Sequence, residues 1–185
     1  EALYKVRHQQ PFVSLGYSYD IEEAYFHRSM NGRIFVAIQG ILTNEQKLQE
    51  KYGPLGDFIV QFIEEGHSTE EAVRRVGYLL EGQVALFVID ALHPDTLFIA
   101  QLGKVLHAGK GKNGYLIATE AQVLSDEIEH IFVLREEEFA VVRPENCTVT
   151  NLDGTERDPL THFRESRLNE QHQDAIEDRM FQYMH

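Results

Sequence analysis

The stretch that decides the fold runs from Asn31 to Leu48 and reads NGRIFVAIQGILTNEQKL. The dipeptide Asn31-Gly32 predicts a tight turn, because both residue types tolerate positive φ angles. Arg33 to Ile38 then predicts a short, mostly apolar strand that ends at Gly40, where the backbone bends or comes close to another group. A helix capped within Thr43-Asn44 is expected next. A strand, a glutamine–glycine corner and a capped helix together make a suitable rim for a polar pocket.

Helical and strand patterns follow one another in the rest of the chain. Ser68 to Leu80 predicts a helix with a capping box, in which Ser68 and Glu71 satisfy each other's backbone amides. Asp57 to Glu65 predicts a second, amphipathic helix. Gly109 to Gly114 matches the G-x-G-x-x-G pattern of dinucleotide sites, but a strand rather than a helix follows, which favours a hairpin loop. Runs rich in β-favouring residues lie at Phe12–Tyr19, Val84–Ala91, Thr96–Leu102, Val105–Ala108, Tyr115–Thr119, Ile131–Leu134, Phe139–Arg143 and Thr148–Thr150.

The acidic run Glu136 to Glu138 lies between two of these expected strands. Three neighbouring carboxylates favour a solvated turn over an acid/base pair. The sequence therefore predicts a hairpin in which Ile131–Leu134 and Phe139–Arg143 flank an exposed acidic turn.

Composition limits the classes of function. The chain has 185 residues, 43% of them hydrophobic, and a formal net charge of −13. This charge argues against partners such as nucleic acids or anionic membranes. The single cysteine, Cys147, is interpreted as structural and fits a reducing compartment. Since no apolar run could span a bilayer and no signal peptide is recognised, a cytoplasmic location is expected. One histidine near two acids, His27, falls short of a zinc set, so neither a metal nor a cofactor is expected.

The stretch from Asn31 to Leu48 resembles the hNGiieNyeeL segment of class II glutamine amidotransferases, particularly the glutaminase domains of glucosamine-6-phosphate synthases. The resemblance continues through Leu80–Ile89, which is similar to the family's L-x-G-a-y-A strand. It extends to Pro94–Leu97, a hairpin turn, and to Gly103–Leu106, similar to G-S-P-L, and it covers roughly residues 25 to 150. It implies an α+β fold: the four-layer α/β/β/α sandwich of the N-terminal nucleophile hydrolases, with two antiparallel sheets between helices.

The resemblance also implies which residues would form the site. Gln39 and Gly40 match the asparagine and glycine that hold the oxyanion in the family. Leu55 takes the place of the T-D-T-E aspartate that binds the α-amino group of glutamine. Arg7 matches the arginine of T-R-W-A-T-H-G, which holds the substrate carboxylate, and His27 matches the last histidine of N-A-H-P-H-x-S. An apolar side chain cannot neutralise an ammonium, and a longer amide moves the oxyanion donor, so an impaired site is expected.

Family members hydrolyse glutamine with an N-terminal cysteine, whose free α-amine is the general base for its own thiol. The sequence opens at Glu1 and contains no catalytic residue of this kind. Residues 1–160 are therefore expected to form a glutaminase-like domain without its first strand. Residues 161–185 are expected to be a polar linker and helix that lead toward sugar-phosphate isomerase domains.

Three functional interpretations remain open at this point. The first is a degenerate domain with weak or no glutamine hydrolysis, acting as a scaffold or regulatory module in a homo-oligomeric synthase-like protein. The second is an active glutaminase whose cysteine lies in residues outside this sequence, with glutamine as its substrate. The third is a relative acting on another amide, because Leu55 suggests a ligand without an α-ammonium.

Overall fold

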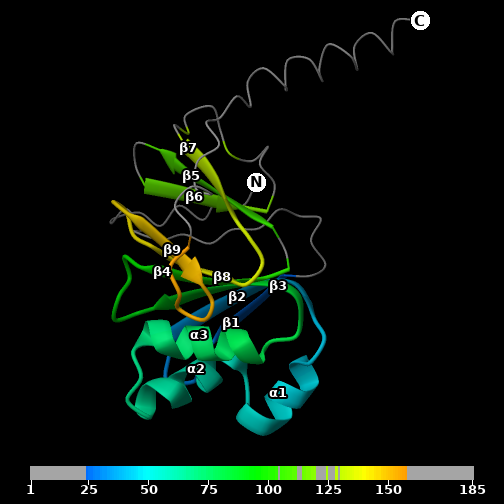
Figure 1. Cartoon of the computed structure of the whole chain (residues 1–185). Helices are drawn as coiled ribbons and strands as arrows, with labels where there is room; N and C mark the ends of the chain where they lie inside the picture. The colour runs from blue at the N-terminus through cyan, green and yellow to red at the C-terminus, as the bar shows by residue number, and fades with distance from the viewer. Residues whose placement is uncertain are drawn as a thin grey trace, which may run out of the picture.

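A computed structural model describes residues 24–157 of the chain, apart from 104, 112, 113, 120–123, 125–127 and 129. This part of the chain forms two antiparallel sheets and three helices (Figure 1). In chain order the elements are β1 (Ala24–Arg28), β2 (Ile34–Leu42), α1 (Glu45–Tyr52), α2 (Leu55–Glu64), α3 (Thr69–Leu79), β3 (Gly82–Asp90), β4 (Leu97–Leu102), β5 (Leu106–Gly111), β6 (Gly114–Ala118), β7 (His130–Leu134), β8 (Glu138–Val142) and β9 (Cys147–Asn151).

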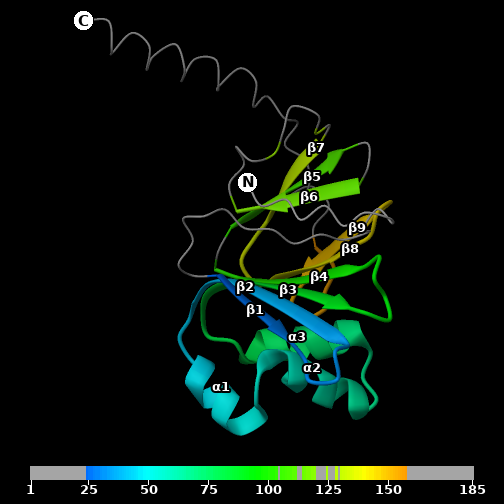
Figure 2. The same ribbon diagram turned by 180° about the vertical axis from the view of Figure 1, so that it is seen from behind.

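The larger sheet has six strands in the order β1-β2-β3-β4-β8-β9. The three helices cover one of its faces, as the two opposite views show (Figures 1 and 2). Alternate residues of the central strands point into this layer, and Val36, Val84 and Leu86 pack there against Phe58 and Val76. All five side chains are at most 2% exposed, so this is the main hydrophobic core.

The smaller sheet has three strands in the order β6-β5-β7 and packs on the opposite face of the larger one. Leu106 and Leu134 lie between the sheets with Ile99 and Ala140, and all four are fully buried. The described residues thus give three of the four expected layers, helices and two antiparallel sheets. Among the described residues there is no second outer helical layer, and the expected strand at Phe12–Tyr19, Glu1 and the expected linker at 161–185 lie outside them.

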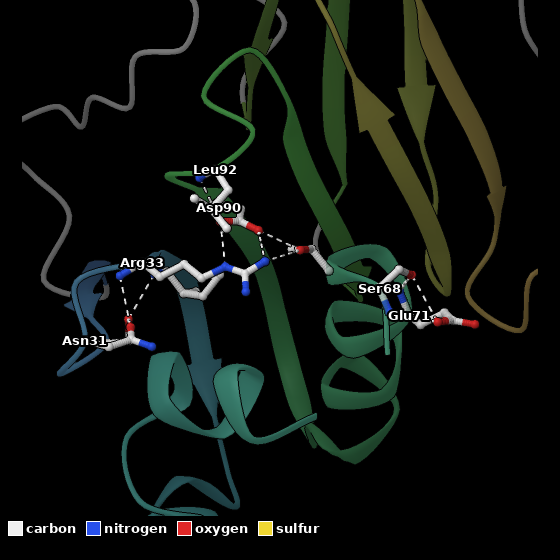
Figure 3. Close-up of polar contacts among 9 residues, drawn as sticks. Asn31, Arg33, Ser68, Glu71, Asp90 and Leu92 are labelled. Carbon is white, nitrogen blue, oxygen red and sulfur yellow. Dashed lines mark hydrogen bonds and ion pairs between the residues drawn. The ribbon is translucent and has the colours of Figure 1, made fainter. Parts of the chain in front are cut away.

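Several local predictions agree with the structure. Gly32 has a φ of +72° in the turn between β1 and β2, and Asn31 Oδ1 accepts a hydrogen bond from the Arg33 amide over 3.0 Å. The capping box of α3 is formed, because Ser68 Oγ accepts from the Glu71 amide while the Glu71 carboxylate accepts from the Ser68 amide (Figure 3). Strands β5 and β6 pair as the hairpin predicted around the glycine-rich segment. Among the described residues, no helix is long and apolar enough to cross a membrane.

The predicted end of the first strand at Gly40 is wrong. Strand β2 continues to Leu42 and pairs with β3 along its whole length, with Gly40 opposite Val84. Gly40 has a φ of +110°, and a Cβ on it would collide with the main-chain oxygen of Gln83. The close approach anticipated at this glycine is therefore real, but it occurs within a strand rather than at its end.

The predicted acidic hairpin is also wrong. Strand β7 pairs with β5 in the smaller sheet, whereas β8 pairs with β4 and β9 in the larger one, so the acidic run carries the chain from one sheet to the other. Glu138 is 5% exposed rather than solvated, and its carboxylate lies 2.9 Å from Arg157 Nε. Arg157 also donates from Nη2 to the Val133 carbonyl over 3.0 Å, and therefore contacts both sheets.

Candidate functional site

The candidate oxyanion residues lie in the second half of β2. Gln39 pairs with Ala85, whose side chain belongs to the core between the two sheets, so Gln39 points to the smaller sheet. Its Nε2 donates to Thr119 Oγ1 over 3.3 Å, just beyond the end of β6. The amide donor that would serve an oxyanion is thus engaged with the smaller sheet, while Gly40 follows it with the backbone conformation described above.

Leu55 and His27 come together on the other face of the larger sheet. Leu55 is the first residue of α2 and is 8% exposed, while His27 lies in the edge strand β1 opposite Val36. Both border a small surface hollow of about 130 Å³. Its full lining is Phe26, His27, Val36, Ile38, Leu42, Glu45, Leu48, Gln49, Gly53, Pro54 and Leu55.

The hollow is suited to an apolar group rather than to an ammonium ion. Most of its lining is aliphatic or aromatic, and Glu45 is the one carboxylate among the lining residues. Glu45 is exposed on the first turn of α1, where an ion pair contributes little because water screens it. An aspartate at the position of Leu55 would instead be partly desolvated at the start of α2.

The sequence-predicted site residues therefore do not form one cluster. The structure brings His27 and Leu55 together, but it places Gln39 on the opposite face of the sheet. Arg7 lies outside the described residues. Within the part of the chain that the structure describes, no three His, Cys, Asp or Glu side chains are grouped so that they could hold a metal ion.

A buried ionic network that the sequence did not indicate lies where β2 begins and β3 ends, since Ile34 is paired there with Asp90. Asp90 is fully buried at the end of β3, and Arg33 donates to both of its oxygens, over 3.0 Å from Nε and 2.7 Å from Nη2 (Figure 3). Thr69 Oγ1 donates to the same carboxylate over 2.7 Å, and the Leu92 amide donates over 3.0 Å. The network joins two strands to the start of α3, which gives it a structural role.

Burial by itself raises the pKa of Asp90, but the hydrogen bonds from Arg33, Thr69 and the Leu92 amide outweigh it and hold that pKa below its usual value. Such a carboxylate stabilises the fold above its unfolded pKa of about 4, and this contribution is lost as the pH falls through the lower folded pKa.

We therefore expect Asp90→Asn to lower the free energy of unfolding at pH 7, with the difference from the parent shrinking below about pH 4. Urea unfolding of both proteins between pH 3 and pH 7 measures this. Asp95→Asn, at an exposed carboxylate nearby, is the matched control. A difference for Asp90→Asn that is constant over the whole pH range would contradict the assignment.

A second, more polar hollow of about 340 Å³ lies beside this network. It is lined by Ser68, Thr69, Glu70, His93, Asp95, Thr96, Phe98 and Arg143. Acidic and basic side chains are mixed in its wall, so its charge favours neither an anion nor a cation.

The single cysteine does not have the environment of a nucleophile. Cys147 lies at the start of β9, and burial raises the pKa of its thiol to about 12. A thiol with that pKa is almost entirely protonated at neutral pH and therefore unreactive. This agrees with a structural role for Cys147.

Comparison with known proteins places this geometry in a family. No family model matches the chain. Among curated proteins, it is 32% identical over 146 residues to the glutamine–fructose-6-phosphate aminotransferase (isomerizing) of Listeria innocua, a match that covers 73% of this chain and 24% of that protein. The enzyme of the same name from Shouchella clausii is 30% identical over 154 residues, covering 75% of this chain and 25% of that protein. The chain thus spans about a quarter of the length of these relatives.

Solved structures show the same fold. The glutamine phosphoribosylpyrophosphate amidotransferase of B. subtilis matches with a TM-score of 0.55 and 19% identity, over 76% of this chain and 34% of that one. An allosteric regulatory enzyme of purine biosynthesis matches with a TM-score of 0.53 and 18% identity, over 73% of this chain and 32% of that one. The antiparallel amidotransferase fold of the N-terminal nucleophile hydrolase type is therefore confirmed. The chain belongs to the class II glutamine amidotransferases, as a domain related to the glutaminase part of the glutamine–fructose-6-phosphate aminotransferases.

Proposed function

We propose that this domain is a glutaminase-like module with weak or no glutamine hydrolysis, which serves as a scaffold or regulatory part of a larger aminosugar-phosphate synthase-like protein. The observation that carries the proposal is Leu55. In the motif that this position matches, an aspartate binds the substrate ammonium, and here an aliphatic side chain lies in an apolar hollow.

The energetic argument concerns the α-ammonium of glutamine. Moving an ammonium from water to an apolar surface is unfavourable unless an opposite charge meets it. Glu45 is the one carboxylate in the lining, but it is exposed on another helix. Loss of a charged hydrogen bond costs roughly 1.5–3 kcal/mol, which corresponds to an affinity loss of about ten- to a hundredfold.

Gln39 adds a second, independent argument. An oxyanion donor works only when it is held at the position where the negative charge develops. The side chain of Gln39 is one methylene longer than asparagine, and its Nε2 already donates to Thr119. Using it for catalysis would require breaking this hydrogen bond and moving the side chain.

The remaining part of the proposal follows from the relatives. They are isomerizing aminotransferases about four times as long as the matched region. A domain that keeps the fold but loses substrate contacts can still pack against sugar-phosphate isomerase domains of the same protein and contribute to a homo-oligomer in the cytoplasm.

The alternative is an active glutaminase domain whose cysteine lies outside this sequence. The observation in its favour is that position 39 keeps a side-chain amide, which can donate a hydrogen bond. This alternative requires glutamine to bind without the aspartate.

The test restores the missing carboxylate. We expect the unaltered chain to bind glutamine more weakly than about 1 mM, and Leu55→Asp to bind it at least about tenfold more tightly than Leu55→Asn does. Leu55→Asn is the matched control, because it carries the same packing loss and the same shape without the charge. Calorimetric titration with glutamine and an ammonia-release assay are the measurements.

Glutamine hydrolysis by the unaltered protein at about 1 per second or faster, within the ordinary enzyme range, would overturn the proposal in favour of the active alternative. Equal affinities of Leu55→Asp and Leu55→Asn would show that Leu55 is not what prevents glutamine binding.

A further inference from the structure

The polar hollow beside the Asp90 network is built from three segments that are far apart in the sequence. The start of α3, the turn before β4 and the turn after β8 meet there, because Leu97 of β4 is paired with Val142 of β8. Its volume of about 340 Å³ lies at the lower end of the range for small-molecule sites. The lining of this polar hollow is Ser68, Thr69, Glu70, His93, Asp95, Thr96, Phe98 and Arg143, and it shares no residue with the Leu55 hollow.

The inner wall of the polar hollow is buried and held in place. Thr69, Thr96 and Phe98 are only 6%, 4% and 5% exposed. Thr69 Oγ1 donates to the Asp90 carboxylate over 2.7 Å and accepts from Arg33 Nη2 over 3.4 Å, in the network beside the start of α3 (Figure 3). Side chains that are already fixed lose little conformational entropy when a ligand binds, so this wall is suited to binding.

Two opposite charges on the rim of the polar hollow are not paired with each other. Asp95 and Arg143 are exposed and flank the paired ends of β4 and β8, yet neither forms an ion pair with any side chain that the structure describes. Glu70, in contrast, is already paired with Arg74 over 2.9 Å. Thr96 Oγ1 donates to Asp95 Oδ1 over 3.1 Å, which orients the Asp95 carboxylate.

We propose that the polar hollow binds a free α-amino acid with a small side chain. The α-carboxylate of this ligand accepts hydrogen bonds from the Arg143 guanidinium, and its α-ammonium donates to the Asp95 carboxylate. A simple anion meets Asp95 as a like charge, and a simple cation meets Arg143 as a like charge. A molecule with both charges close together satisfies both side chains, because these come from neighbouring strand ends.

A bound amino acid joins the start of α3 to two strands of the larger sheet, which gives the module an effector site. This inference does not depend on whether the domain hydrolyses glutamine, since it concerns neither Leu55 nor Gln39. Exposed ion pairs contribute little in water, so we expect a Kd on the order of 10 mM. Glutamine bound here with similar affinity remains weaker than the limit of about 1 mM expected above.

The experiment is a titration of the full chain with L-alanine, followed by the NMR shifts of its backbone amides. We expect saturable shifts at Thr69, Asp95 and Arg143, and none at Leu55. Propionate and ethylammonium each keep the methyl group and one of the two charges, and should bind at least about fivefold more weakly than L-alanine.

Substitutions in the same titration test the two charged side chains. Arg143→Gln and Asp95→Asn should each weaken L-alanine binding at least about fivefold. Lys47→Gln, which removes an exposed positive charge from α1, is the matched control and should leave the affinity unchanged. Both charged residues of the hollow are exposed, so their variants should keep the parent spectrum elsewhere.

Three results would each overturn the inference. The first is a set of shifts that grow without saturation, and the second is equal binding of L-alanine and either singly charged analogue, which would assign the hollow to a simple ion. The third is an unchanged affinity in both charge variants. Glutamine hydrolysis by the unaltered protein would overturn the proposed function instead and would leave these titrations as expected, so the two failures can be told apart.

Discussion

Gly40→Ala is expected to destabilise this domain by about 3 kcal/mol or more, a large part of the stability of a typical domain. Two effects add at this position. A φ of +110° is strained for any residue with a side chain, and the new Cβ would collide with the main-chain oxygen of Gln83. Because that oxygen belongs to the paired strand β3, relief requires the two strands to separate locally. Chemical denaturation at pH 7 measures the effect.

Gly66→Ala is the matched control for this prediction. Gly66 has a similar φ of +98°, but a Cβ there would meet no atom within 4 Å. The Gly66→Ala variant should therefore lose only the free energy of unfolding that a positive φ costs a residue with a side chain, about 1 kcal/mol. Similar losses for the two variants would contradict the proposed collision with Gln83.

This result also bears on function. Gly40 is needed for the packing of β2 against β3 whether or not the domain hydrolyses glutamine. Its presence therefore does not favour the active alternative, and the decision rests on Leu55 and Gln39.

Arg157→Met is expected to destabilise the domain by about 3–5 kcal/mol, because it removes the guanidinium that neutralises the buried Glu138 carboxylate. The hydrogen bond that Glu138 accepts from the Arg135 amide brings no compensating positive charge. The side chains of Arg157 and Glu138 are only 4% and 6% exposed, so water cannot replace the lost contact. The Val133 carbonyl also loses the donor that links the smaller sheet to this pair. Glu138→Leu should be similarly destabilising, since it removes the carboxylate that lies 2.9 Å from the buried Arg157 guanidinium.

The double variant distinguishes a coupled pair from two separate contacts. Removing both charges leaves no buried ion, so the double variant should cost at least about 1 kcal/mol less than the sum of the single variants. Glu136→Gln, in the exposed turn, is the matched control and should change stability by less than about 0.5 kcal/mol. Strict additivity of the two single variants would show that the pair is not coupled.

Much of the local structure could be predicted because the interactions that form it are local. The capping box between Ser68 and Glu71 closes within three residues, and the turn at Asn31-Gly32 depends on the φ angles that these residues tolerate. The motifs between Asn31 and Ile89 identified the family, since each carries several residues in a fixed order. Hydrophobic alternation also located strand β3 to within two residues at its start.

The tertiary structure decided which strands pair and which charged side chains meet when the partners are far apart in the sequence. Ile131–Leu134 and Phe139–Arg143 look like the arms of a hairpin in the sequence, yet their partners are β5 in one sheet and β4 in the other. Glu138 looks solvated beside Glu136, yet Arg157, far along the chain, neutralises it in a buried position. The same is true of Asp90, whose partner Arg33 is 57 residues away.

The sequence by itself determined the family, the antiparallel fold and the two substitutions, Leu55 and Gln39, on which the proposed loss of activity rests. Only the tertiary structure decided that these two residues lie on opposite faces of one sheet, that Gly40 is a packing requirement, and that two carboxylates are buried with arginines. The physical reason is that capping, turns and periodicity are set by neighbours in the chain. The burial of a side chain, the face of the sheet on which it lies and the partner of its charge depend on which distant strands pair. That pairing is determined by the packing of the whole core.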